Sequence, residues 1–137
     1  MRFLIIIFSL FLGKLQAQEI HKHRWKQRIV LIVSNTNSDL ATKQWKELIK
    51  DAEDLKERKI IIYQVLPKYY KTSTTQKKEL NTRLYSKFKT KKSDFLVVLI
   101  GLDGRIKLKQ ANFLSSQKLF SIIDGMPMRR NELRNKN

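Results

Sequence analysis

The sequence predicts an α/β protein: a three-layer α/β/α sandwich on a four-stranded mixed sheet, with the element order β-α-β-α-β-β-α. The length of 137 residues suits one domain. Three short runs that are wholly or largely apolar, at 29–33, 60–65 and 95–100, are typical of strands buried on both faces. Segments of helical period follow the first two runs. A Gly-Leu-Asp-Gly turn and an alternating strand follow the third.

The first strand is expected at 29–33, where every residue is apolar. The polar cluster 34–39 follows, and such residues hydrogen-bond the free amides at the start of a helix. A helix therefore begins near Leu40. One apolar stripe runs along about four of its turns at spacings of three and four. It consists of Ala41, Trp45, Leu48, Ile49, Ala52 and Leu55.

The second strand is expected at 60–65 and is closed by Pro67, which has no amide donor for a sheet. A loop with two tyrosines at 69–70 follows. Ser73 and Gln76 have the spacing of a capping box and predict the start of a second helix. The buried face of this helix repeats every four residues. It consists of Leu80, Leu84 and Phe88.

The third strand is expected at 95–100, in the interior of the sheet. The turn at 101–104 ends in Asp-Gly, which readily takes positive φ angles, and so predicts a hairpin to a strand at 105–109. In that strand the apolar Ile106 and Leu108 should share one face, with basic side chains on the wet face.

A last helix is expected to start near 115–116 and to end at Gly125, with Pro127 preventing its continuation. Its buried contacts are Leu119, Ile122 and Ile123. The residues at 131–137 are polar and are expected to form a frayed tail. The folded domain should therefore span 18–130.

The first residues predict a secretory signal peptide at 1–17. Arg2 precedes a largely apolar run from Phe3 to Leu12, and Ala17 supplies a small residue at the cleavage site. An uncleaved anchor is the alternative, but about ten apolar residues are too few for the hydrocarbon core of a bilayer. We therefore expect cleavage after Ala17 and a secreted or periplasmic chain without a transmembrane span.

The composition is strongly basic. The formal net charge is +17, and +15 remains after Arg2 and Lys14 leave with the leader. Such a charge attracts polyanions through long-range forces that salt screens. Export favours an acidic or sulfated polymer, an anionic lipid surface or an envelope or matrix protein over nucleic acid. The alternative is that the lysines only solvate the surface. Cysteine is absent, which excludes disulfides and thiol chemistry.

Three segments give the chain a resemblance to a known family: 25–28 (Trp-Lys-Gln-Arg), 99–108 around the Asp-Gly turn, and 124–132 with its Met-Pro-Met-Arg core. Together they resemble domain-of-unknown-function family 4174 over essentially the whole mature chain. That family looks thioredoxin-like and peroxiredoxin-related, and it is also a module of animal extracellular matrix proteins. The element order is also that of the thioredoxin core, in which we expect three parallel central strands joined by right-handed crossovers. The resemblance implies a fold but no activity.

The loop between the first strand and the first helix holds the reactive cysteines of redox-active thioredoxin-like proteins. In this chain the corresponding place is occupied by residues 37–40, which include no cysteine, and the proline usually found before the third strand is also missing. Ser38 and Asp39 either form an anion site with the free helix amides or simply cap the helix.

The segment 126–130 is a second candidate site. Met126 and Met128 could supply flexible apolar contacts while Arg129 and Arg130 grip a carboxylate, sulfate or phosphate in fork geometry. The alternative is that the methionines plug the end of the core and the arginines face water.

The third candidate is the segment 66–92, which has nine basic residues and one acidic residue, with tyrosines interleaved. Lys77, Lys78 and Lys87 are its candidate contacts to a polyanion or glycan, although a solvated helix face would have the same composition. No cofactor and no metal site are predicted, because the two histidines at 21 and 23 lie in a lead that is expected to be mobile.

These observations favour an exported, redox-inactive module that binds an anionic partner without catalysis. Two other classes stay open. One is a cysteine-independent enzyme with Ser38 or Asp39 at the ancestral site of a peroxiredoxin-like scaffold. The other is a structural or chaperone-like envelope component that docks through its C-terminal segment.

Overall fold

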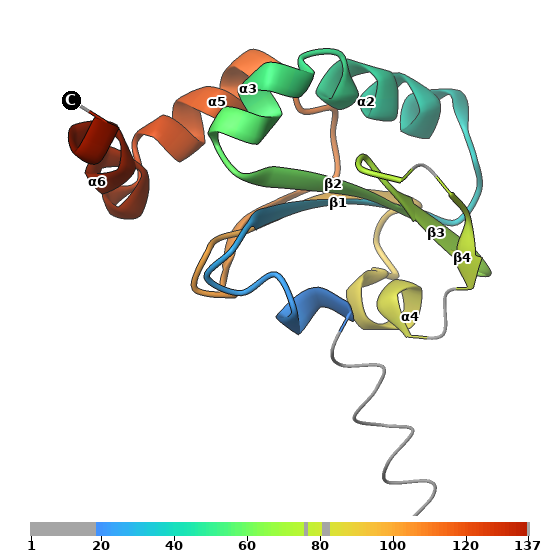
Figure 1. The fold of residues 1–137 in the computed structure, drawn as a ribbon. Helices are drawn as coiled ribbons and strands as arrows, with labels where there is room; N and C mark the ends of the chain where they lie inside the picture. Colours follow the sequence, from blue (N-terminus) through green and yellow to red (C-terminus); the bar gives the residue numbers. More distant parts are fainter. Residues whose placement is uncertain (1–18, 76, 81–82, 137) are drawn as a thin grey trace, which may run out of the picture.

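The computed structural model describes residues 19–136 apart from 76 and 81–82, so the predicted leader at 1–17 lies outside the described residues (Figure 1). The elements are β1 (Arg28–Ser34), α2 (Asp39–Ile49), α3 (Ala52–Glu57), β2 (Ile60–Val65), β3 (Tyr69–Thr72), β4 (Glu79–Leu80), α4 (Leu84–Phe88), β5 (Phe95–Ile100), β6 (Ile106–Gln110), α5 (Ser116–Asp124) and α6 (Pro127–Lys136). The strands form one mixed sheet of order β4-β3-β2-β1-β5-β6. The α/β class is confirmed, but the sheet has six strands instead of the expected four.

The strand directions differ from the expectation. β1 is parallel to β2, but β5 is antiparallel to β1. The expected three parallel central strands are therefore wrong. The reason lies in the short connection: Phe95 pairs with Ser34, so β5 starts where β1 ends. The five-residue α4 spans only about 7 Å, too little to carry the chain back along a whole strand.

Two apolar cores lie on the two faces of the sheet, because alternate residues of a strand point in opposite directions. Helices α2, α3 and α5 cover one face, and α4 covers the other together with the segment 19–26 (Figure 1). Val30 and Ile32 of β1 belong to the first core, whereas Ile29 and Leu31 belong to the second. β1 and β5 are therefore buried on both faces, as predicted.

The long first helix is divided. The apolar stripe packs on the sheet as expected except for Ala52, which is exposed. The chain leaves helical geometry at Asp51, which has φ −110° and ψ 71°. Aspartate competes with the backbone inside helices and is preferred at their starts, so a new helix, α3, begins after it. Leu55 on α3 still reaches the core because the break keeps it on the same face.

The predicted start of the second helix is wrong. Ser73 donates its backbone N–H to the Ile62 carbonyl at 2.8 Å, and its Oγ accepts the Ile62 N–H at 3.0 Å. The segment after Pro67 therefore extends the sheet as the hairpin β3–β4 and does not begin a helix. Leu80 is 83% exposed, whereas Leu84 and Phe88 are buried on α4 as predicted. Gln76 lies outside the described residues.

A bulge corrects the pattern expected for β6. Leu108 pairs with Leu99 but Ile106 pairs with Ile100, so Lys107 is an additional residue on this strand. An extra residue rotates the side chains before it to the other face of the sheet. Leu108 packs on the first core, while Ile106 is on the opposite side and 51% exposed.

The hairpin turn exists, and Gly104 alone takes the positive φ there, at +81°. The C-terminal segment is more ordered than predicted. Helix α5 is capped by the Ser115 Oγ and ends at Gly125, as expected. However, Pro127 does not end helical structure, because proline is favoured at the first position of a helix, and here it opens α6. The segment expected to be a frayed tail is therefore helical to Lys136. None of the helices in the described part of the chain is long and apolar enough to cross a membrane.

Candidate functional site

Three arginines meet carboxylates at the end of the molecule where α3, α5 and α6 come together with the start of β1 (Figure 1). Arg58 places Nε and Nη2 on the two oxygens of Asp124, at 3.1 and 3.0 Å. Its guanidinium also stands 4.4 Å from the centre of the Phe120 ring. Burial opposes ionisation of Asp124, but hydrogen bonds from Arg58 and Arg129 hold its pKa below the ordinary value.

Arg129 is the most heavily committed of the candidate arginines. Its side chain is 1% exposed and contacts Glu57 at 3.0 Å, Asp124 at 3.1 Å and Glu132 at 3.4 Å. The hydrogen bond from Arg129 is the main cause that lowers the pKa of Glu57. These donors are used inside the fold, so Arg129 joins α6 to α3 and is not open to an external anion.

The other residues of the segment 126–130 have different positions. Met126 is partly buried against the first core, Met128 is 39% exposed, and Arg130 is exposed. The two methionines line a cavity of about 330 Å³ together with Arg28 and Leu102. The segment thus contributes both to the core and to a pocket wall. Of its two arginines, only Arg130 faces water.

The lysines of the segment 66–92 are arranged differently from the arginines. Four of them stand over aromatic rings: Lys71 over Trp45 at 4.4 Å, Lys78 over Tyr69 at 4.7 Å, Lys87 over Phe88 at 5.5 Å and Lys89 over Tyr85 at 5.8 Å. Burial, with repulsion from Lys78, lowers the pKa of Lys71. Within the described residues, no basic residue of this segment forms a salt bridge.

The candidate lysines do not form one cluster. Lys78 extends over β3, while Lys87 lies on α4 and lines a second cavity, of about 120 Å³, with Arg24 and Phe88. Lys77 is exposed next to Lys78. We call the basic residues of β3, β4, α4 and their flanks the basic edge: Lys68, Lys71, Lys77, Lys78, Arg83, Lys87, Lys89, Lys91 and Lys92.

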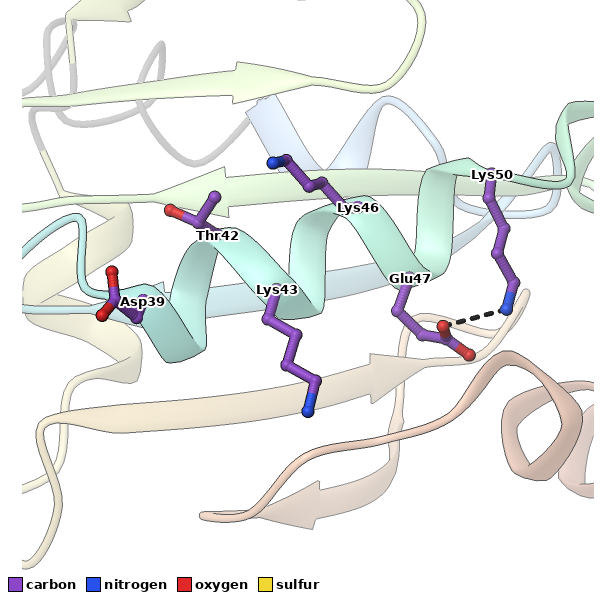
Figure 2. A pocket seen from close by; sticks show the side chains of 6 residues that line it. All are labelled: Asp39, Thr42, Lys43, Lys46, Glu47 and Lys50. Atoms are coloured by element: carbon purple, nitrogen blue, oxygen red, sulfur yellow. Dashed lines mark hydrogen bonds and ion pairs between the residues drawn. The ribbon is translucent and has the colours of Figure 1, made fainter.

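The loop before α2 holds a helix cap. The Ser38 Oγ accepts the Ala41 N–H at 3.2 Å, which uses the hydroxyl as a cap. Asp39 is exposed and lines a shallow pocket along α2. Figure 2 shows that Lys43 and Lys46 of this pocket point to opposite sides of the helix, and that Lys50 pairs with Glu47, at 2.9 Å. These side chains spread along the helix and do not converge on a ligand.

The N-terminal lead, which was expected to be mobile, packs against the sheet from residue 19 onward. His23 is 9% exposed, and its Nε2 lies 2.7 Å from the Tyr63 hydroxyl. That hydroxyl donates to Glu19 at 3.0 Å, and the Tyr63 ring stacks on Tyr70. Burial lowers the pKa of His23 and raises the pKa of Tyr70 to about 12. The sequence missed this contact because it joins residues forty positions apart.

In the part of the chain that the structure describes, no cluster of three histidines or carboxylates is arranged to hold a metal ion. The molecule is an α/β protein with an arginine–carboxylate cluster at one end and, at the other, basic side chains that form no salt bridge with any residue that the structure describes. The chain belongs to the family described as Domain of unknown function (DUF4174), which matches residues 19–132. No curated protein and no solved structure matches it.

Proposed function

We propose that this chain is an exported, redox-inactive module of thioredoxin-like fold that binds an anionic polymer through the basic edge. The observation that carries the proposal is the segregation of charge. Eight of the twelve acidic residues lie on α2, α3, α5 and α6 or at the break between α2 and α3. Five of these eight pair with arginines or lysines: Glu47, Asp54, Glu57, Asp124 and Glu132. The basic edge has no such partners among the described residues, so its field extends into solvent.

The fold relation is supported by the element order, although β5 runs antiparallel to β1 and not parallel to it as expected. Without the β3–β4 hairpin, the elements from β1 to α5 follow the order β-α-β-α-β-β-α on four strands, apart from the break between α2 and α3. The loop that carries cysteines in redox-active relatives of that fold has Ser38 here, and its hydroxyl already caps α2. This loop is therefore more consistent with a binding role for the module than with a catalytic one. Cleavage of the predicted signal peptide would leave the module outside the cytoplasm, and we propose acidic polysaccharides and envelope or matrix proteins as its partners there.

The lysines over aromatic rings support the same role. A ring beneath an ammonium group holds the charge at the surface without neutralising it, unlike a carboxylate. Lys71 and Lys78 share this arrangement on neighbouring parts of β3 and its hairpin. Burial is the larger cause of the lowered pKa of Lys71 and repulsion from Lys78 is the smaller one, and an anion bound between the two lysines would relieve that repulsion.

The test measures how the affinity for a sulfated polysaccharide falls with salt. In the Lys77→Gln/Lys78→Gln/Lys87→Gln variant we expect the slope of log K against log [salt] to fall by about two to three, since each lost contact removes about one. The matched control Lys56→Gln/Lys109→Gln/Lys118→Gln loses the same charge from exposed sites elsewhere. Equal slopes in the two variants would show that net charge alone attracts the polymer and would refute the basic edge as its site.

A further inference from the structure

A cavity of about 330 Å³ lies where the β5–β6 turn faces the junction of α5 and α6. It is lined by Arg28, Gly101, Leu102, Asp103, Lys107, Met126, Pro127 and Met128. This volume is within the range of small-molecule sites, which are mostly apolar with a few placed polar groups. The cavity is separate from the basic edge, and its walls come from all three segments that gave the sequence its family resemblance.

Arg28 is a buried polar group in the wall of this cavity, and the fold leaves its hydrogen-bonding groups incompletely satisfied. Its side chain is 1% exposed. Nη1 donates to the Arg58 carbonyl at 2.8 Å, and Glu132 lies 3.4 Å from Nη1 and 3.3 Å from Nη2. Nη2 and Glu132 Oε1 are an ion pair without hydrogen-bond geometry, and Nε has no hydrogen-bond partner among the described residues. A buried guanidinium N–H that lacks an acceptor costs free energy that a ligand can recover.

The geometry of the guanidinium identifies the missing acceptor. Glu132 lies against the edge formed by Nη1 and Nη2, so the buried edge formed by Nε and Nη2 is the one that lacks a hydrogen-bond acceptor among the described residues. That edge presents two parallel N–H groups, which match the two oxygens of a carboxylate. Arg58 uses the same edge to bind Asp124, at 3.1 and 3.0 Å.

The remaining walls define the rest of the ligand. Leu102, Pro127 and the two methionines are apolar, and the methionines are unbranched side chains that move easily to admit a ligand to a buried group. At the mouth, Lys107 pairs with Asp103 at 2.9 Å. Gly101 permits this position, since a Cβ there would lie 2.6 Å from Lys107 Cε. Lys107 therefore adds a second cation near the entrance, already oriented by Asp103.

We propose that this cavity binds a compact apolar group that carries one carboxylate, with Arg28 holding the carboxylate and the Met126–Met128 segment covering the apolar part. This inference goes beyond the binding of polymers at the basic edge. The carboxylate can come from a small organic acid or from the C-terminus of a peptide that ends in an apolar residue, and both offer the same chemistry to Arg28.

The experiment titrates the full mature chain with phenylacetate and with acetyl-Ala-Phe, each beside its neutral amide, and follows the ¹³C methyl signals of Met126 and Met128. We expect at least one acid to bind at least tenfold more tightly than its amide and to shift both methyl signals. The better of the two acids identifies the source of the carboxylate. Equal affinity for acid and amide, or no shift with either acid at millimolar concentration, would overturn the proposal.

Two variants refine the test. Arg28→Lys keeps the charge but removes the fork, and we expect it to lose at least tenfold in affinity for the acid. Because Arg28 is buried, Met128→Trp serves as a second variant: the side chain is 39% exposed, so the fold should tolerate a ring that fills the cavity. We expect Met128→Trp also to weaken binding at least tenfold, and unchanged binding would contradict the site. The Lys77→Gln/Lys78→Gln/Lys87→Gln variant should bind the acid as the wild type does, which separates this site from the basic edge.

Discussion

Replacing Arg129 with alanine should strongly destabilise the fold. The arginine is 1% exposed and makes contacts of 3.0 to 3.4 Å to three carboxylates. Removing one partner of a buried ion pair costs about 3–5 kcal/mol. Two of the three carboxylates, Glu57 and Asp124, have side chains that are 41% and 37% exposed. Water can partly solvate them in the variant, so we expect a loss of about 2–3 kcal/mol, which for a domain of this size lowers Tm by about 10 °C.

Urea and thermal unfolding, followed by the fluorescence of the buried Trp45, measure this loss. Arg130→Ala is the matched control, because it is the next residue, has the same side chain and is exposed. We expect it to change stability by less than about 0.5 kcal/mol. If Arg129→Ala were as stable as Arg130→Ala, the arginine cluster would not hold α6 to α3, and Arg129 would again be a candidate for binding.

Three further outcomes can be checked. The pKa of Asp124 is lowered in the folded state, so the stability that it contributes is complete above the unfolded value near pH 4 and is lost as the pH falls further. Acid titration of the wild type should show this loss, and Asp124→Asn should reduce the slope of stability against pH. The pKa of His23 is lowered from 6.5 by burial, so unfolding should become easier as the pH drops below that value, and a slope that persists in His23→Gln would contradict this origin. Gly104→Ala should lower the free energy of unfolding by about 1 kcal/mol because φ there is +81°. Gly125→Ala should cost less, because φ is −81° and a Cβ there would meet no atom closer than 3.6 Å. Equal losses of stability in denaturant unfolding would count against backbone strain in the turn.

The strands and helices that depend on local pattern could be predicted from the sequence. The runs that became β1, β2 and β5 are continuous apolar segments, and the stripe through Trp45 and Leu48 identified α2. Each of these signals depends on burial within a few turns or one strand. The hairpin β3–β4 could not be predicted in this way, because Ser73 pairs with Ile62 across the sheet edge and not with a helix amide.

The candidate sites show the same limit. The exposed lysines of 66–92 could be recognised from composition, because an absence of acidic neighbours is visible along the chain. The pairing of Arg129 inside the fold could not be recognised from the sequence, since its partner Glu57 lies seventy-two residues away. One signal was present: Arg28 is a charged residue that begins an otherwise apolar strand, and such a residue is buried only when the fold gives it acceptors. The cavity beside it depends on three segments that meet only in the folded chain.

The most direct test of the binding account is a map of the surface that a polyanion covers. A short heparin-like oligosaccharide would be titrated into the ¹⁵N-labelled mature chain at physiological salt while the backbone amide signals are followed. We expect shifts in β3, β4 and α4 and in the residues that flank them, with α3 and α6 unaffected. Shifts concentrated on α6, or spread evenly over the molecule, would contradict the claim that the charge left unpaired by the fold is what binds.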